Sequence, residues 1–310
     1  MRLVFLGTPE FAVPTVEALE RAGHQILAVV AQPDRPAGRG QALKAPATKV
    51  WASVHGVPVL QPEKVRDGVL AAALGALRPD LLVVTAYGRI LGRDLLTLAP
   101  LGAVNVHASL LPRWRGAAPI QWAVASGDRE TGVTIMQMDE GLDTGDMLLV
   151  RTADIGAEET AEALAPRLAA LGGEAIVEAL PLLAAGGLVP VKQAAAEVTL
   201  APILEKGTGR LDFTRPAAEL ACRVRGFTPW PGTFTSAGGK VLKVHRAAAR
   251  DGQAGDGAPG AARVVGGALR VACGGGTALE LLEVQPEGKK RMAARDFVNG
   301  LPAGGLVLGA

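Results

Sequence analysis

At 310 residues the chain is longer than a typical single domain, which predicts two domains. Hydrophobic residues make up 49% and charged residues 20% of the chain, a composition that excludes a disordered or fibrous protein. No apolar run approaches the roughly 18–20 residues that a bilayer-spanning helix needs, and Cys222 and Cys273 match no metal or redox spacing. We therefore expect a cytoplasmic protein without a membrane partner. No heptad pattern or long apolar stripe argues for assembly, so a monomer is expected.

The net charge is only +2, but it is unevenly distributed. From Glu205 onward there are 15 basic and 9 acidic residues, against 17 and 21 in the preceding part. A basic second domain fits an anionic partner such as a nucleic acid, because phosphates attract Lys and Arg regardless of base sequence. An ordinary basic surface explains the same count, and both interpretations stay open at this point.

The first part of the chain alternates between apolar strands and helices. Arg2–Leu6 predicts a strand, and Thr8 followed by Pro9 predicts the N-cap and first position of a helix that runs to about Ala22. Further strands are expected at Gln25–Ala31, Asp80–Ala86, Ala103–Val106 and Gly132–Met138, and helices at about Ala117–Ser126 and Ala157–Ala185. This alternation predicts an α/β domain over residues 1–186 with a doubly wound, mostly parallel sheet.

Residues 187–208 contain prolines and little periodicity, which predicts a linker. Residues 209–310 predict a helix at Arg215–Gly226, followed by a small β-barrel. The segment Ala247–Ala261 is rich in Gly, Ala and Asp and is expected to be a mobile surface connection. The strands of the barrel are expected at Gly232–Ser236, Val241–Arg246, Ala262–Val265, Ala268–Cys273 and Leu279–Val284.

Two nucleotide-binding motifs are absent from the places where they would be expected. The turn after the first strand, Gly7-Thr8-Pro9-Glu10-Phe11, lacks the G-x-G-x-x-G spacing that brings backbone close to a pyrophosphate. The segment Gly38–Lys44 has no Gly-Lys-Ser/Thr and so is not a P-loop. A dinucleotide or P-loop site is therefore not expected.

Polar side chains gather at the end of the strand Ala103–Val106. Val104 and Val106 point to one face of the sheet, so Asn105 and His107 stand side by side on the other. Open α/β sheets bind their ligands at such strand ends. Two hydrogen-bond donors there suit an enzyme that must hold an oxyanion. Taken alone, His107 is better explained as a satisfied polar residue at a strand end.

The segment Asp139–Asp146 places four carboxylates in eight residues after the next strand. It lacks the EF-hand spacing, so cation binding is disfavoured. A solvated acidic loop is the plain interpretation. Because Gly141 and Gly145 flank the middle of the segment, we expect a tight loop that presents Asp143 to the neighbouring strand end.

Together these residues resemble the folate-dependent formyltransferases, whose active-site asparagine, histidine and aspartate fall on Asn105, His107 and Asp143. The similarity extends over most of the chain, and two segments resemble the tRNA-acting branch of that family. The matching segments are Val4–Pro9, Gln32–Gly40, Asn105–Ala118, Gly141–Gly145, Phe227–Gly232 and Gly288–Lys290. The resemblance implies a formyltransferase-type Rossmann-like domain followed by an OB-like barrel.

The resemblance also implies the reaction. The family's tRNA-acting members transfer the formyl group of 10-formyltetrahydrofolate to the amine of methionyl-initiator tRNA, without a metal. Asn105 and protonated His107 would donate hydrogen bonds to the oxygen of the tetrahedral centre, and one such donor is typically worth about 10²–10³ in rate. Asp143 would orient His107 or accept the proton of the amine through water.

Binding residues follow from the same resemblance. The folate is expected against Tyr87, Gly88, Ile90 and Leu91, with Ser109, Leu110, Leu111 and Pro112 nearby, although Ile90 and Leu91 are equally plausible core residues. The tRNA is expected against Arg35, Arg39, Lys44 and Lys206. The first three lie in a proline-rich loop, Gln32–Lys49, that is expected to be mobile without a partner. A solvated surface loop is its alternative interpretation.

Two other functions are compatible with parts of the sequence. A formyltransferase acting on a nucleotide-sugar amine would share the catalytic residues but would not need the basic loop. A nucleic-acid-binding protein with an inactive α/β scaffold would need neither Asn105, His107 nor Asp143, and all three are present.

Overall fold

The computed structural model describes residues 1–37, 42–250, 257–299 and 306–309. These form two compact units. The first comprises Met1–Pro119, Glu130–Asp154 and Ala165–Pro202, and the second comprises Ile120–Arg129, Ile155–Leu164 and Ile203–Ala310. Helices α5 (Pro119–Ala125) and α6 (Ala161–Ala184) contribute to both units. No helix within the described ranges is long and apolar enough to cross a bilayer.

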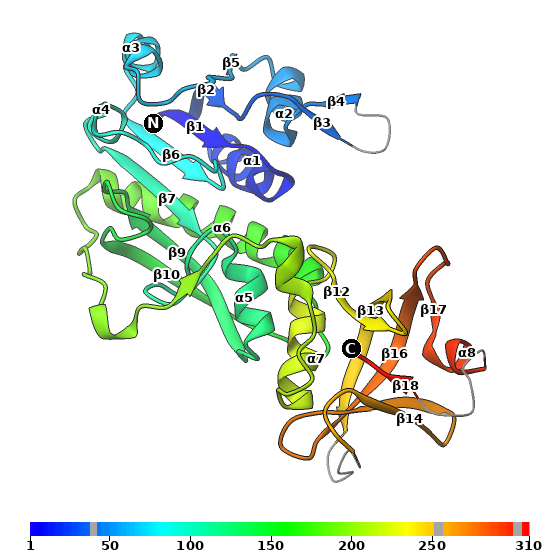
Figure 1. The fold of residues 1–310 in the computed structure, drawn as a ribbon. Coiled ribbons are helices and arrows are strands. Elements are labelled where there is room, and N and C mark those ends of the chain that lie inside the picture. The colour runs from blue at the N-terminus through cyan, green and yellow to red at the C-terminus, as the bar shows by residue number, and fades with distance from the viewer. Residues whose placement is uncertain (38–41, 251–256, 300–305, 310) are drawn as a thin grey trace. The chain divides into compact units, whose positions relative to one another are not determined.

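The first unit is built on a seven-stranded sheet (Figure 1). From edge to edge its strands are β10 (Met147–Asp154), β9 (Glu130–Gln137), β7 (Ala103–His107), β6 (Leu81–Thr85), β1 (Arg2–Gly7), β2 (Gln25–Val30) and β5 (Val59–Leu60). The five strands from β7 to β5 pair in parallel, whereas β9 and β10 run antiparallel to their neighbours. The predicted mostly parallel sheet is confirmed, and β10 is a strand that was not predicted from the sequence.

Helices cover both faces of this sheet. On one face, α3 (Val69–Ala76) and α4 (Arg93–Leu96) pack against alternate residues of β1 and β6. On the other face, α6 approaches β7 so closely that a Cβ on Gly172 would come within 2.8 Å of Val106 Cγ1. A Cβ on Gly173 would come within 3.1 Å of Ala18 in α1 (Val13–Arg21), so α1 and α6 share that face. The sheet is therefore buried on both sides, as its apolar strands predict.

The chain between β1 and α1 differs from the expectation. A short 3-10 turn, η1 (Glu10–Ala12), precedes α1, and Thr8 caps neither element. Its hydroxyl instead donates to the carbonyl oxygen of Tyr87 at 3.3 Å and accepts from the Gln32 backbone N–H at 3.2 Å. The predicted N-cap was wrong because the same hydroxyl joins three strand ends.

The segment Gln32–Lys49 contains more regular secondary structure than predicted. Strands β3 (Arg35–Ala37) and β4 (Ala42–Lys44) pair antiparallel as a hairpin, and α2 (Ala47–Val54) follows at once (Figure 1). Lys49, in α2, forms an ion pair of 2.8 Å with Asp34. The expectation of an irregular loop is therefore wrong for β3, β4 and α2, and its mobility without a partner stays a prediction.

The second unit contains a nearly closed antiparallel barrel, as predicted. Its strands are β12 (Thr233–Ala237), β13 (Lys240–Arg250), β16 (Ala278–Pro286), β15 (Ala268–Ala272), β14 (Ala261–Val265) and β18 (Leu306–Val307), with β17 (Met292–Ala293) paired to β16. A bridge between Ala237 and Leu308 joins the two edges. Because β13 runs to Arg250, residues 247–250 are strand rather than mobile connection.

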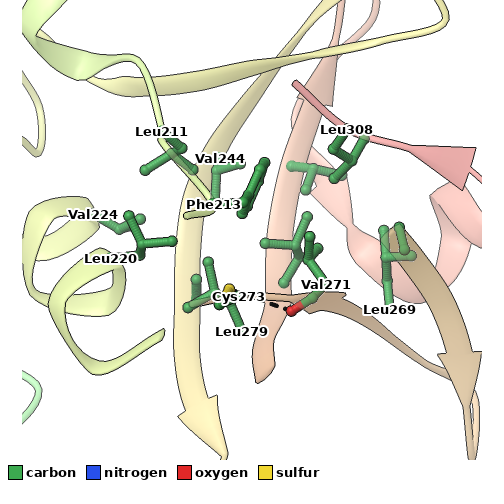
Figure 2. Close-up of a cluster of buried hydrophobic side chains, with 14 of the residues drawn as sticks. Leu211, Phe213, Leu220, Val224, Val244, Leu269, Val271, Cys273, Leu279 and Leu308 are labelled. Atoms are coloured by element: carbon green, nitrogen blue, oxygen red, sulfur yellow. Dashed lines mark hydrogen bonds between the residues drawn. The ribbon is translucent and has the colours of Figure 1, made fainter. Parts of the chain in front are cut away.

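The core of the second unit lies between the barrel and two helices. Leu220 and Val224 of α7 (Ala217–Gly226) meet Phe213, Leu279 and other buried side chains (Figure 2). The remaining short helices of the chain are η2 (Ala195–Glu197), η3 (Lys206–Gly209) and α8 (Ala294–Val298).

Candidate active site

Strand β7 positions Asn105 and His107. Val106 faces α6, so Asn105 and His107 lie on the opposite face, as the alternation predicts. Both side chains are buried, with 9% and 5% of their surface exposed. Parallel pairing with β6 fixes the backbone of this strand, and Val84 lies opposite Asn105. The two polar side chains are thus held on a strand inside the sheet rather than on a loop.

Asp143 reaches these two residues from the loop between β9 and β10. Its Oδ1 accepts a hydrogen bond from Asn105 Nδ2 at 3.4 Å, and its Oδ2 lies 3.7 Å from His107 Nδ1. The Gly116 backbone N–H also donates to Oδ2 at 2.9 Å. The three polar residues singled out from the sequence therefore meet, although Asp143 follows His107 by more than thirty residues.

The other ring nitrogen of His107 has a fixed partner. Nε2 lies 3.0 Å from the backbone carbonyl oxygen of Trp114. A carbonyl oxygen only accepts, so Nε2 must carry a hydrogen, and Nδ1 is the nitrogen that faces Asp143. Trp114 was not among the predicted site residues, because a backbone carbonyl leaves no trace in residue type.

The turn after β7 is stabilised by its own polar groups. Ser109 Oγ donates to the Arg113 carbonyl oxygen at 2.6 Å, and Thr134 Oγ1 donates to the Ser109 carbonyl oxygen at 2.7 Å. Among the predicted folate residues, Leu111 and Pro112 are buried and Leu110 is half-buried. The Ser109 hydroxyl is therefore used within the turn, and its predicted contact with folate stays a prediction.

The loop after β6 separates core residues from exposed ones. Tyr87 and Leu91 are each 2% exposed and belong to the core, and burial raises the pKa of the Tyr87 hydroxyl. The Tyr87 carbonyl oxygen accepts from Thr8 and from Gln32 Nε2. Gly88 (φ 77°) and Ile90 lie between Tyr87 and Leu91 in sequence, and Ile90 exposes its apolar side chain. Of the four residues predicted here, Ile90 offers the side-chain surface that a flat ring can cover.

A cavity of about 800 Å³ lies where β1, β2 and β6 end. Its apolar wall includes Val13, Val50 and Trp51, and charged residues border it. The charged lining residues are Glu10, Arg35 and Lys44. Asn105, His107 and Asp143 are not among its lining residues, although β7 is the strand next to β6. The cavity was not predicted from the sequence because its walls come from four separate segments.

The predicted tRNA-binding residues lie in two places. Arg35 and Lys44 pair across the β3–β4 hairpin, and both are exposed. Lys206 is exposed in η3 of the second unit. Arg39 lies outside the described residues. The structure thus presents two of the four predicted cations on one hairpin beside the cavity.

The acidic loop is shaped from within. Asp139 Oδ1 accepts from the Gly141 backbone N–H at 3.0 Å and from Thr144 Oγ1 at 2.6 Å. Across the described part of the chain, no group of three or more His, Cys, Asp or Glu side chains is arranged to hold a metal ion.

Two side chains that were not predicted to be functional contact this site from the segment expected to be a linker. Gln193 Nε2 donates to the backbone carbonyl oxygens of Asp143 and Gly145, at 2.9 and 2.7 Å. Thr199 Oγ1 accepts from the Trp114 backbone N–H at 2.9 Å. Part of this segment, β11 (Leu200–Ala201), pairs in parallel with β8 (Arg115–Gly116).

Sequence comparisons place the chain among known proteins. Residues 1–180 match the family model described as formyl transferase, and residues 203–302 match the formyl transferase C-terminal domain. A relative from Anaeromyxobacter dehalogenans, named methionyl-tRNA formyltransferase, is 68% identical over 97% of both chains. A relative of the same name from Myxococcus xanthus is 56% identical over 96% of this chain and 95% of its own.

Structural comparisons agree on the fold. The N-formyltransferase from Helicobacter canadensis, solved with folinic acid and dTDP-3-aminofucose, has a TM-score of 0.67 at 16% identity. The alignment covers 92% of this chain and 98% of that one. Glycinamide ribonucleotide transformylase 1 from Symbiobacterium toebii has a TM-score of 0.52 at 24% identity, over 61% of this chain and 90% of its own. The chain belongs to the formyl transferase family, whose members are formyl-transferring enzymes.

Proposed function

We propose that this chain transfers the formyl group of 10-formyltetrahydrofolate to the free amine of methionyl-initiator tRNA. The observation that carries the proposal is the meeting of Asn105, His107 and Asp143 at one strand end. The name shared by relatives at 68% and 56% identity supports methionyl-tRNA as the acceptor. Folate ligands named for more distant solved structures support a folate donor.

In this proposal the folate supplies the formyl carbon and the aminoacyl end supplies the attacking amine. Asn105 Nδ2 donates a hydrogen bond to the formyl oxygen as that oxygen gains negative charge. Protonated His107 donates from Nδ1 to the same oxygen, while the Trp114 carbonyl keeps its ring in place. Each donor of this kind is worth about 10²–10³ in rate in well-studied enzymes.

Asp143 has a separate role in the proposal. Once the amine has attacked, its nitrogen carries a proton that must leave, and the Asp143 carboxylate accepts it directly or through one water. The proton then passes to N10 of the folate as the bond between that nitrogen and the formyl carbon breaks, so tetrahydrofolate leaves with the proton that the amine has lost. The side chain is only 14% exposed, so few water molecules compete for it. The carboxylate also lies 3.7 Å from His107 Nδ1, where it helps to orient the ring.

The cavity bordered by the β3–β4 hairpin suits the aminoacyl end of the acceptor. Val13, Val50 and Trp51 offer an apolar wall to the thioether side chain of methionine. Arg35 and Lys44 place two positive charges at its border, where they can contact phosphates. Lys206 and Arg39 are proposed to contact the same RNA. The folate is proposed to lie beside Gly88 and Ile90, with the turn Ser109–Pro112 on its other side.

A nucleotide-sugar amine remains the second candidate acceptor. It is favoured only by likeness of fold, since the sugar formyltransferase from Helicobacter canadensis is 16% identical to this chain. The basic hairpin argues for RNA, because a sugar nucleotide carries far fewer phosphates than a tRNA acceptor arm.

The deciding experiment supplies the purified chain with 10-formyltetrahydrofolate and either methionyl-initiator tRNA or a dTDP-amino sugar. We expect formylation of the methionyl-tRNA and none of the sugar, with product identified by mass spectrometry after deacylation. Formylation of the sugar together with an untouched methionyl-tRNA would refute the proposed acceptor while leaving the formyl-transfer chemistry in place.

A further inference from the structure

The segment that follows α6 reaches the active site with two side chains. We infer that Gln193 and Thr199 are positioning residues that hold the His107–Asp143 pair in its reactive geometry. The inference rests on the proposed function of that pair. Both residues are half-buried, and both belong to the same compact unit as the pair itself.

Gln193 holds the backbone of the Asp143 loop. Asp143 has φ of 52°, a left-handed conformation that residues other than glycine rarely adopt. Gln193 Nε2 donates to the carbonyl oxygens of Asp143 and Gly145, which uses both of its hydrogens. Its Oε1 accepts from Arg115 Nε at 2.8 Å, so the amide has one orientation that satisfies all three partners. The loop is therefore fixed on both sides of Thr144.

Thr199 acts on the histidine through Trp114. Its hydroxyl oxygen accepts from the Trp114 backbone N–H, and its own carbonyl oxygen accepts from the Arg115 N–H at 2.9 Å. Trp114 also has a positive φ, of 66°. The carbonyl oxygen of the same residue is the partner of His107 Nε2. Thr199 thus fixes the peptide that determines which ring nitrogen carries the hydrogen.

The contacts made by Gln193 and by Thr199 converge on strand β8, because both residues bond Arg115. The Gly116 N–H donates to Asp143 Oδ2, and Gly116 lies opposite Ala201 of β11. With φ of 123°, a Cβ on Gly116 would come within 2.7 Å of the Ala201 carbonyl oxygen, so only glycine allows this close pairing. One strand pair therefore supports the ring of His107 and the carboxylate of Asp143 at once.

Thr199 provides the cleaner test because one substitution removes the hydroxyl and another keeps it. Thr199→Val removes the acceptor for Trp114 N–H while keeping a β-branched side chain, and Thr199→Ser keeps the acceptor. We expect Thr199→Val to lower kcat by about 10- to 100-fold with both KM values nearly unchanged, because small misplacements of reacting groups cost this much. Thr199→Ser should retain most of the wild-type kcat. A wild-type kcat in Thr199→Val, or an equal loss in Thr199→Ser, would overturn the inference.

Gln193 is tested through its dependence on Asp143. Gln193→Leu should lower kcat by about 10-fold or more in the wild-type background and have little further effect when Asp143→Asn is already present, because residues that act through one another are not additive. An equal loss in both backgrounds would mean that Gln193 contributes only to general stability. Gln285→Leu removes a comparable bond, from Nε2 to the Lys289 carbonyl oxygen, in the second unit and should leave kcat unchanged.

The same variants separate this inference from the proposed function. If Asp143→Asn retains the wild-type kcat, the proposed role of the pair fails. If Asp143→Asn loses activity while Thr199→Val does not, only the positioning inference fails. Thermal unfolding of each variant identifies any that do not fold, and should Gln193→Leu be one of them, the comparison of Thr199→Val with Thr199→Ser decides.

Discussion

The Nε2 atom of His107 lies 3.0 Å from the carbonyl oxygen of Trp114, seven residues further along the chain. This contact assigns the hydrogen to Nε2 and leaves Nδ1 facing the Asp143 carboxylate at 3.7 Å. This separation is too long for a hydrogen bond, so Nδ1 can meet a third partner such as the formyl oxygen of the proposed substrate. The Trp114 carbonyl oxygen therefore orients the ring, and the second ring nitrogen is the one that the proposed mechanism uses.

Replacing the Asp143 carboxylate tests its role directly. In Asp143→Asn the side chain keeps its size but loses its charge and can no longer take a proton from the amine. We expect kcat to fall by about 10⁴-fold, the loss seen when an aspartate that supports a histidine becomes an amide. Steady-state formylation kinetics measure the effect. Glu140→Gln, an exposed carboxylate in the same loop, is the control and should keep the wild-type kcat.

The loop that carries Asp143 also depends on Gly145. A Cβ at this position would overlap the backbone carbonyl oxygen of Gln137, so Gly145→Ala must displace the loop. We expect kcat to fall by about 10²-fold or more, because a shift of about 1 Å is enough for such a loss. Gly75→Ala is the matched control, since the Cβ added there would lie 3.6 Å from the nearest atom, an ordinary contact with Leu98. A normal kcat in Gly145→Ala would show that the loop tolerates the shift.

The hairpin cations should act on RNA affinity and not on chemistry. The double variant Arg35→Ala/Lys44→Ala should raise KM for methionyl-tRNA and leave kcat unchanged. The plot of log(kcat/KM) against log salt concentration should become less steep by about one unit for each phosphate that the hairpin no longer neutralises. Arg21→Ala, which removes a cation that is 73% exposed at the end of α1, should leave that slope unchanged. An unaltered slope in the double variant would argue against RNA binding by this hairpin.

Glu280 predicts an acid-sensitive contribution to the stability of the barrel. A hydrogen bond from Arg250 is the main cause that lowers the pKa of this carboxyl, and the charges of Arg250 and Arg270 lower it further against the effect of burial. A lowered pKa in the folded state means that the stabilisation is complete above the ordinary pKa of glutamate. It is lost as the pH falls through the folded-state value.

Glu280→Gln should therefore lower the free energy of unfolding by about 2 kcal/mol at pH 7, the range for hydrogen bonds to charged groups. The difference from the wild type should shrink as the pH falls below the ordinary glutamate pKa, and urea denaturation at several pH values measures it. Glu287→Gln, which changes an exposed carboxyl beyond the same strand, should cost much less. A difference that does not change with pH would contradict the assignment.

Local patterns were enough to predict part of the site. Asn105 and His107 are two residues apart on one strand, so their shared face follows from strand geometry alone. Asp143 could be singled out because Gly141 and Gly145 bracket it and indicate a tight loop. The parallel strands were predictable because strands buried on both faces are continuously apolar. Each of these inferences needed only neighbours in sequence.

What could not be predicted depends on interactions between distant segments. Gln193 and Thr199 bind backbone groups, which every residue possesses, so no residue type marks their partners. The two-residue strands β8 and β11 are too short to show periodicity. Thr8 was predicted as a helix cap because it precedes Pro9. Its hydroxyl instead forms hydrogen bonds with the backbone of Tyr87 and of Gln32, which are distant in sequence. Strand β10 lies at the sheet edge and begins directly after Asp146, so its sequence could not be separated from the acidic loop.

The pairing of β11 with β8 also restricts the number of residues that can separate Gln193 from Thr199. Thr199 follows Gln193 by only six positions, and each must meet a different part of the active site. A strand that slips by one residue turns its side chains to the opposite face. Insertions or deletions between these two positions should therefore inactivate the enzyme, although the composition of the segment predicted only a linker.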